Sequence, residues 1–135
     1  LGVDHCINAL QNPIDALKDL TNGDLADVVY EATGAPVAME NSFNYVGHGG
    51  KLVLVSIVKG KISFEDPLFH SREMTVMSSR NATHEDFNNV MNALREQKID
   101  ISPFVTHRCQ FDELTSLFEK WSNPDSKVIK GIVSF

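Results

Sequence analysis

The sequence predicts an α/β fold with a partial, doubly wound parallel sheet and helices on both faces, because short apolar segments alternate with amphipathic ones. Residues 26–30 (ADVVY) and 51–58 (KLVLVSIV) are almost continuously apolar, which is typical of strands covered on both sides. The segment between them opens at Pro36 and repeats its apolar side chains at helical spacing. Strand, helix and strand in this order predict a βαβ unit.

The first two helices have recognisable ends. A helix over 13–21 is predicted from Asn12, which can cap it, and from Gly23, which can end it. The second helix begins at Pro36, and the glycine-rich stretch 47–50 (GHGG) is expected to stop it.

The later part of the chain continues the alternation. Residues 62–66 (ISFED) alternate apolar and polar as a half-exposed strand does, and 73–79 predict a further strand. The clearest helical pattern follows Thr83, a second one occupies 114–121, and the residues after 127 predict a final strand.

Composition narrows the class of protein. With 135 residues, of which 42% are apolar, the chain can bury one ordinary core. A net charge of -6 argues against nucleic acid as a partner. No apolar run is long enough to span a bilayer, and Cys6 and Cys109 suggest two reduced thiols rather than a disulfide. We therefore expect a cytoplasmic protein with no membrane partner.

Polar side chains follow the predicted strands. In parallel sheets, ligands bind beyond the carboxyl ends of the strands. The stretches 31–34, 56–57 and 78–81 occupy such positions and are the candidate binding loops.

Several motifs in order resemble one family. ADVVYEATGAPVAMENSFNYVGHGGKLVLVSI, REMTVMSSRNATHEDF, VTHRCQFDEL and KVIKGIVSF are similar to the carboxyl-terminal part of medium-chain dehydrogenases of the zinc-type alcohol and polyol branch, near the sorbitol, idonate and threonine dehydrogenases. The resemblance implies an NAD(P)-binding Rossmann domain joined to a catalytic domain that holds zinc and transfers hydride to or from an alcohol.

The same resemblance implies that parts of the family pattern lie outside this sequence. The glycine-rich phosphate loop and the zinc ligands have no counterpart here, so residues 1–135 are interpreted as the carboxyl-terminal portion of the Rossmann domain, inactive by itself. Residues 5–8 (HCIN) would be the third strand of an order 3-2-1-4-5-6, which leaves the strand at 26–30 with an unpaired apolar edge. We expect this piece to be marginally stable, or its sheet to be completed by a second copy.

Site residues follow from the resemblance. Thr33 and Gly34 would approach the ribose and adenine of NAD or NADP. Ser56 stands where many relatives carry glycine, and Lys130 would approach the pyrophosphate. The full set implied to bind the cofactor is Thr33, Gly34, Val55, Ser56, Ile57, Ser79, Arg80, Asn81 and Lys130. An ordinary strand-to-helix turn and an exposed terminal lysine remain alternatives, and Glu31 is interpreted as structural.

The sequence also leads to expectations about assembly and about an alternative function. The resemblance places Ile62, Ser63 and Phe64 in an edge strand that pairs with the same strand of a second copy in a homodimer. No histidine has the spacing of a metal site or catalytic triad. The alternative to a dehydrogenase part is a non-catalytic α/β module that binds a nucleotide or serves in assembly.

Overall fold

The structure, a computed structural model, describes residues 2–135 and divides them into two compact units. The first unit is Val3–Asn81, and the second is Ala82–Phe135 together with Gly2. The sequence predicted one continuous domain, and each unit is described separately below.

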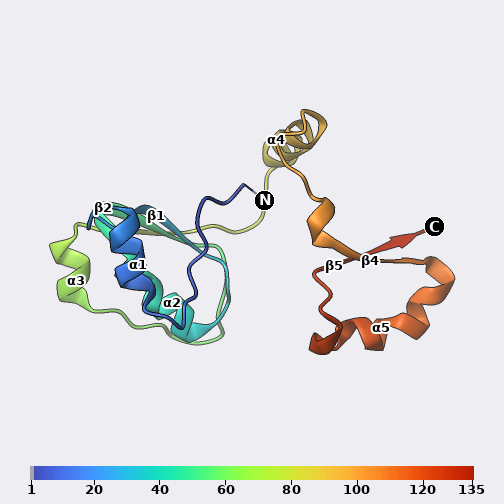
Figure 1. The fold of residues 1–135 in the computed structure, drawn as a ribbon, viewed down its shortest axis with the longest axis horizontal. Helices are drawn as coiled ribbons and strands as arrows, with labels where there is room; N and C mark the ends of the chain where they lie inside the picture. Colours follow the sequence, from blue (N-terminus) through green and yellow to red (C-terminus); the bar gives the residue numbers. More distant parts are fainter. Residues whose placement is uncertain (1) are drawn as a thin grey trace. The chain divides into compact units, whose positions relative to one another are not determined.

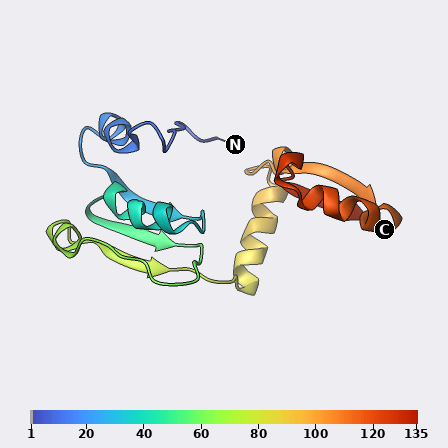
Figure 2. The ribbon, with the colours of Figure 1, turned by 90° about the horizontal axis from the view of Figure 1, so that it is seen from below.

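The first unit is built on a three-stranded parallel sheet (Figures 1 and 2). Its strands are β1 (Ala26–Glu31), β2 (Val46–Leu54) and β3 (Thr75–Ser78), in the order β1-β2-β3. Glu31 pairs in register with Leu54, and Leu54 with Ser78, so the three carboxyl ends are level. The predicted parallel α/β fold is confirmed.

Three helices belong to this unit: α1 (Pro13–Leu20), α2 (Pro36–Ser42) and α3 (Asp66–Ser71). Proline stands in the first turn of each, where its missing N–H costs no helical hydrogen bond. The sequence predicted that the Asn12 side chain caps α1, but it does not. The Asn12 side-chain amide donates to the Asp15 carboxylate at 2.5 Å instead. Helix α3 was not predicted from the sequence.

The core of this unit lies on one face of the sheet. Phe43, Val46, Leu52 and Met74 are buried together, and side chains of α3 pack against them. The opposite face carries exposed apolar side chains, among them Tyr30 with 70% of its surface accessible. The packing energy of the unit is therefore concentrated between the sheet, α2 and α3.

Two predicted strands do not form. Residues 5–8 form no strand. Residues 62–65 form none either, and helix α3 begins at Asp66. A strand needs a neighbour for its N–H and C=O groups, and the sheet of the first unit contains only β1, β2 and β3. The alternation at 62–66 has a different cause: Ile62 packs on the core while the Ser63 N–H donates to Glu40.

The glycine-rich stretch 47–50 lies inside β2 and does not stop the second helix, contrary to the prediction. Close packing favours glycine at two of its positions, Gly47 and Gly50. A Cβ on Gly47 would lie 2.4 Å from the Asp24 carbonyl oxygen, and one on Gly50 would lie 2.7 Å from a methyl of Val46.

The second unit contains α4 (His84–Arg95) and a two-stranded parallel sheet of β4 (Val105–Gln110) and β5 (Lys130–Ser134), joined through α5 (Leu114–Ser122). Thr83 caps α4 as predicted, in a capping box with Asp86. Gly131 lets β5 approach α5, since a Cβ there would lie 2.7 Å from the Trp121 ring. Short 3₁₀ turns complete the two units at Phe43–Tyr45, Ser102–Phe104, Phe111–Glu113 and Pro124–Ser126.

Across residues 2–135, none of the helices combines the length and apolar character that crossing a membrane requires.

Candidate functional site

The candidate site lies where the three strands of the first unit end. A cavity of about 380 Å³ opens between the loops that follow β2 and β3. Because the strands are parallel and level, their following loops meet at one edge of the sheet. The residues that line the cavity are Leu54, Val55, Ser56, Ile57, Ser78, Ser79, Arg80 and Asn81.

The structure brings most of the predicted cofactor residues to this cavity. The two predicted groups after β2 and β3, which are Val55 to Ile57 and Ser79 to Asn81, line it together. Thr33 and Gly34 stand in the neighbouring loop after β1, outside the lining. Lys130 belongs to the second unit, as the first residue of β5. Binding of a cofactor by these residues stays a prediction.

Backbone hydrogen bonds tie the three loops to one another. The Glu31 carbonyl oxygen accepts from the N–H groups of Val55 at 2.9 Å and Ser56 at 3.1 Å. The Leu54 carbonyl oxygen accepts from the Ser79 N–H at 3.0 Å. The parallel ladder thus continues past the last strand residues, which gives the loops fixed relative positions.

Glu31 is the buried polar centre of this edge, with 3% of its surface exposed. Its Oε1 accepts from the Thr33 N–H at 2.8 Å and from the Thr33 hydroxyl, and its Oε2 accepts from the Ser56 hydroxyl. We call Glu31, Thr33 and Ser56 the Glu31 cluster. It joins the loop after β1 to the loop after β2 through side chains as well as through the backbone.

The cluster determines the charge of Glu31. Burial by itself raises the pKa of the carboxyl, but hydrogen bonds from Ser56, from Thr33 and from the Gly34 N–H together lower it below its ordinary value. The carboxyl is therefore ionised at neutral pH. A general acid needs the opposite shift, so the interpretation of Glu31 as structural rather than catalytic agrees with this geometry.

The Thr33 hydroxyl is partly committed inside the protein. It donates its proton to Glu31 and accepts from the Ala35 N–H at 3.1 Å. A hydroxyl has one donor and two acceptor sites, so Thr33 can offer a ligand one lone pair and no proton. A ribose hydroxyl that met Thr33 would have to be the donor.

Two residues of these loops have left-handed backbones. Gly34 has φ of +70°, and a Cβ there would meet only ordinary contacts at 3.8 Å from the Ile57 carbonyl oxygen and 3.9 Å from the Ser56 Cβ. The backbone angle, more than space inside the protein, favours glycine at that position. Asn81 has φ of 63°, which asparagine tolerates better than most side chains.

The histidines do not form a second candidate site. His48 is in β2, His84 begins α4 and His107 is in β4, while His70 pairs with Asp66 at 3.5 Å on the exposed face of α3. Among residues 2–135, no group of three or more His, Cys, Asp or Glu side chains is placed to hold a metal ion.

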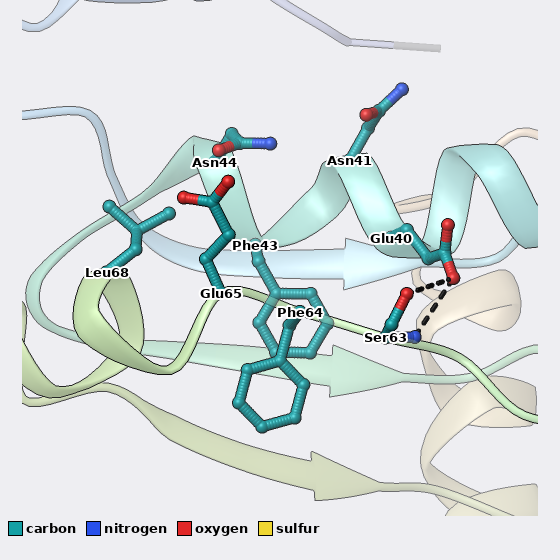
Figure 3. A pocket seen from close by; sticks show the side chains of 8 residues that line it. All are labelled: Glu40, Asn41, Phe43, Asn44, Ser63, Phe64, Glu65 and Leu68. Atoms are coloured by element: carbon teal, nitrogen blue, oxygen red, sulfur yellow. Dashed lines mark hydrogen bonds between the residues drawn. The ribbon is translucent and has the colours of Figure 1, made fainter.

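A smaller cavity, of about 250 Å³, lies between α2 and the segment that precedes α3 (Figure 3). There the Glu40 Oε1 accepts from both the N–H and the hydroxyl of Ser63, each at 2.9 Å, and we call these two residues the Glu40 pair. Phe64 stacks on Phe43 with ring centroids 4.8 Å apart. These contacts account for how the 62–66 segment is held without strand pairing.

Sequence reasoning named the loops but missed what holds them. It did not connect Glu31 with Ser56, although the two residues are 25 positions apart and bonded side chain to side chain. The available signal was a carboxylate at the last position of an apolar strand, followed after one alanine by Thr33 and Gly34.

Comparisons with known proteins agree on one family. The family described as zinc-binding dehydrogenase matches residues 1–96. L-galactonate-5-dehydrogenase of Escherichia coli K12 is 42% identical over 119 residues, which are 88% of this chain and 35% of that protein. L-threonine 3-dehydrogenase of Pyrococcus furiosus is 29% identical over 123 residues, covering 88% of this chain and 35% of that protein.

A solved structure shares the fold. An alcohol dehydrogenase from Escherichia coli CFT073, complexed with NADH, superimposes with a TM-score of 0.82 at 17% identity, over 99% of this chain and 39% of that one. The chain spans roughly a third of the length of the curated relatives it matches, 35% in both cases above.

Proposed function

The chain belongs to the zinc-binding dehydrogenase family, and from this premise we propose that residues 1–135 are part of the NAD(P)-binding domain of an oxidoreductase that acts on an alcohol or polyol. The observation that carries the proposal is the cavity at the carboxyl edge of the β1-β2-β3 sheet. Polar and backbone groups from consecutive parallel strands converge there, as they do in dinucleotide-binding sheets.

The residues present fit one part of a dinucleotide. Ser56, Ser79 and Asn81 offer hydroxyl, amide and backbone groups around a cavity of about 380 Å³, and Gly34 adds a turn without a side chain. Small polar and backbone groups of this kind orient a ligand while apolar residues such as Val55 and Ile57 exclude water from it. We propose that the predicted set, with Lys130 at the pyrophosphate, has this role.

The reaction proposed for the complete protein is oxidation of a secondary alcohol to a ketone and its reverse. The alcohol carbon gives up a hydride, and its hydroxyl gives up a proton that is released to solvent. When bound, NAD(P)⁺ would supply the hydride acceptor. The contribution of this chain is to hold the acceptor in position, which is a proximity effect.

No zinc-dependent step is assigned to this chain. Residues 2–135 place no group of three potential ligands together. We propose that the zinc implied by the family is held by other residues of the complete protein, and that the 135-residue chain by itself has no dehydrogenase activity.

The substrate class is proposed from the named relatives. L-galactonate-5-dehydrogenase and L-threonine 3-dehydrogenase are both named for substrates with a secondary alcohol and a carboxylate. We propose a small polyhydroxy acid or polyol as the substrate of the complete protein.

The test is an assay of the complete protein that contains this chain. Binding of NADH and NADPH is measured by fluorescence, and oxidation of L-galactonate, sorbitol and L-threonine by absorbance of the reduced cofactor. The proposal expects binding of at least one cofactor and oxidation of at least one substrate. Absence of both would favour the non-catalytic assembly module.

Two further parts of the proposal concern assembly and location. We propose a homodimer through Ile62, Ser63 and Phe64, which form no strand here. Pairing with a second copy through all three residues would require the Ser63 N–H to exchange its bond to Glu40 for one across the interface. Light scattering of the complete protein, with Ser63→Pro as the disrupting variant, tests it. We also propose a cytoplasmic location, which fractionation tests.

A further inference from the structure

The Glu31 cluster has more hydrogen bonds than a strand-to-helix turn requires. Glu31 directs both carboxylate oxygens to donors and its backbone carbonyl to two more, while remaining 3% exposed. The donors come from two different loops, since Thr33 follows β1 and Ser56 follows β2. One side chain therefore controls the separation of two of the three loops at the candidate site.

The connection extends to the cavity itself. Ser56 is part of its lining, and its hydroxyl proton goes to Glu31. On the far side of the cavity, Ser79 is tied back to Leu54 through the backbone. Leu54 pairs in register with Glu31, so hydrogen bonds connect Glu31 to both loops that line the cavity.

A catalytic role for Glu31 does not fit this arrangement. Both oxygens already accept hydrogen bonds from protein groups and the side chain is buried, so a substrate would have to displace those donors to reach it. A carboxylate that is bonded at both oxygens and buried can act on a ligand only through the groups it holds.

We propose that Glu31 is a positioning residue, whose buried carboxylate holds Thr33 and Ser56 in the arrangement that the dinucleotide binds. The inference rests on the proposed function and adds to it the residue on which the geometry of the cleft depends. The inference also states which partner donates the hydrogen bond between Thr33 and the ligand. With its proton held by Glu31, Thr33 presents a lone pair, so the ligand group that meets it is a hydroxyl donor such as one on a ribose.

The test uses the complete protein and four variants: Glu31→Gln, Ser56→Ala, Ser56→Thr and the double variant Glu31→Gln/Ser56→Ala. In Glu31→Gln the amide oxygen can still accept from Thr33, but the NH₂ group faces the Ser56 hydroxyl, which must turn to become an acceptor. Loss of a charge-assisted hydrogen bond predicts a KM for the cofactor raised about tenfold. We expect kcat to change by less than about threefold, since the reacting groups are not touched.

The remaining variants separate positioning from a direct contact. Ser56→Ala should raise KM as Glu31→Gln does, and Ser56→Thr should restore it because the hydroxyl is retained. If Ser56 acts through Glu31, the double variant will be no worse than the worse single one. The matched control is Glu40→Gln, which changes a glutamate that also accepts from a serine, outside the cleft, and should leave KM unchanged.

The possible results are distinguishable. If the unmodified protein binds neither NADH nor NADPH, the proposed function fails. If it binds one of them and the folded Glu31→Gln protein binds it equally well, the positioning role is wrong while the proposed function stands. Should Glu31→Gln not fold, the Ser56→Ala and Ser56→Thr pair decides: equal KM values for the two would overturn the proposal.

Discussion

The first unit ties a glutamate to a distant serine twice, and the two places differ in burial. The Glu31 cluster lies at the carboxyl edge of the sheet, and Glu31 is 3% exposed. The Glu40 pair joins α2 to the segment before α3 through solvent-exposed bonds (Figure 3). A bond between a glutamate and a serine hydroxyl therefore occurs in two environments that differ in burial and in the further donors, which are Thr33 at Glu31 and the Ser63 N–H at Glu40.

Their pKa values shift in the same direction for different reasons. Burial raises the pKa of Glu31 and its hydrogen bonds lower it further than burial raises it. For Glu40 the hydrogen bond from the Ser63 N–H comes first, followed by the one from its hydroxyl, and burial opposes them weakly. A lowered pKa therefore does not by itself mark a functional carboxylate, and burial and position must be added.

The largest effect is expected from removing the two glutamates. Glu31→Ala leaves the hydroxyls of Thr33 and Ser56 and the Thr33 N–H without their acceptor at a part-buried site. A donor left unsatisfied costs about 1–3 kcal/mol, so Glu31→Ala should lower the free energy of unfolding of the complete protein by at least that much. Urea denaturation measures it, and Glu40→Ala, the matched change, should give a clearly smaller loss because water replaces its bonds. Equal losses would mean that burial is not the deciding factor.

A smaller effect is expected from removing one donor. Ser56→Ala takes away a hydroxyl that donates to Glu31 Oε2 and leaves the Thr33 bonds in place. The expected loss is about 1 kcal/mol, near the net value of one hydrogen bond. Ser56→Ala should also raise the pKa of Glu31, because a hydrogen bond to its charged form is lost while burial remains. A carboxyl titration followed by NMR checks this, and an unchanged pKa would contradict the bond.

The sequence predicted some elements of the fold and missed others. Period and composition predicted the presence of β1, β2, β3 and α4, because each has an apolar pattern that indicates its type. The bounds of β2 were wrong, since the strand predicted at 51–58 is Val46–Leu54 and residues 55–58 form no strand. They failed for 62–66, where a segment lying on the core shows the same alternation as a strand. They also missed the six-residue helix α3, whose DPLFHS sequence is too short for a helical period to be evident.

At the candidate site, the sequence predicted the loops because parallel strands bring their carboxyl ends together. It could not predict the Glu31–Ser56 bond, which depends on the register that pairs Glu31 with Leu54. The position of Glu31 after an apolar strand singles it out from Glu40 in the sequence, but that position does not show which of the two glutamates is buried. Only the tertiary structure shows that one is buried between two loops.

Glu31 and Glu40 should also differ in how much each contributes to the pH dependence of the free energy of unfolding. A carboxyl whose pKa is lowered on folding stabilises the protein fully above its unfolded pKa, about 4.3 for glutamate, and this contribution is lost as pH falls through the folded value. Glu31→Gln removes the contribution, so the free energy of unfolding should fall less steeply in the variant as pH decreases from about 5 to 3. Glu40→Gln should flatten the curve less, because solvent screens its exposed bonds. Parallel curves for Glu31→Gln and the unmodified protein would show that Glu31 titrates normally.

The smallest effect is expected for Ser63→Ala. Removing this hydroxyl leaves the Ser63 N–H donating to the same Glu40 oxygen at 2.9 Å, and water can take the vacated position. The Glu31 cluster has no such reserve at Oε2, where Ser56 donates through its side chain while its N–H is directed to the Glu31 carbonyl oxygen. The midpoint of urea unfolding should therefore move less for Ser63→Ala than for Ser56→Ala. A larger shift for Ser63→Ala would mean that the segment before α3 depends on its serine side chain, and that the backbone bond alone does not hold it.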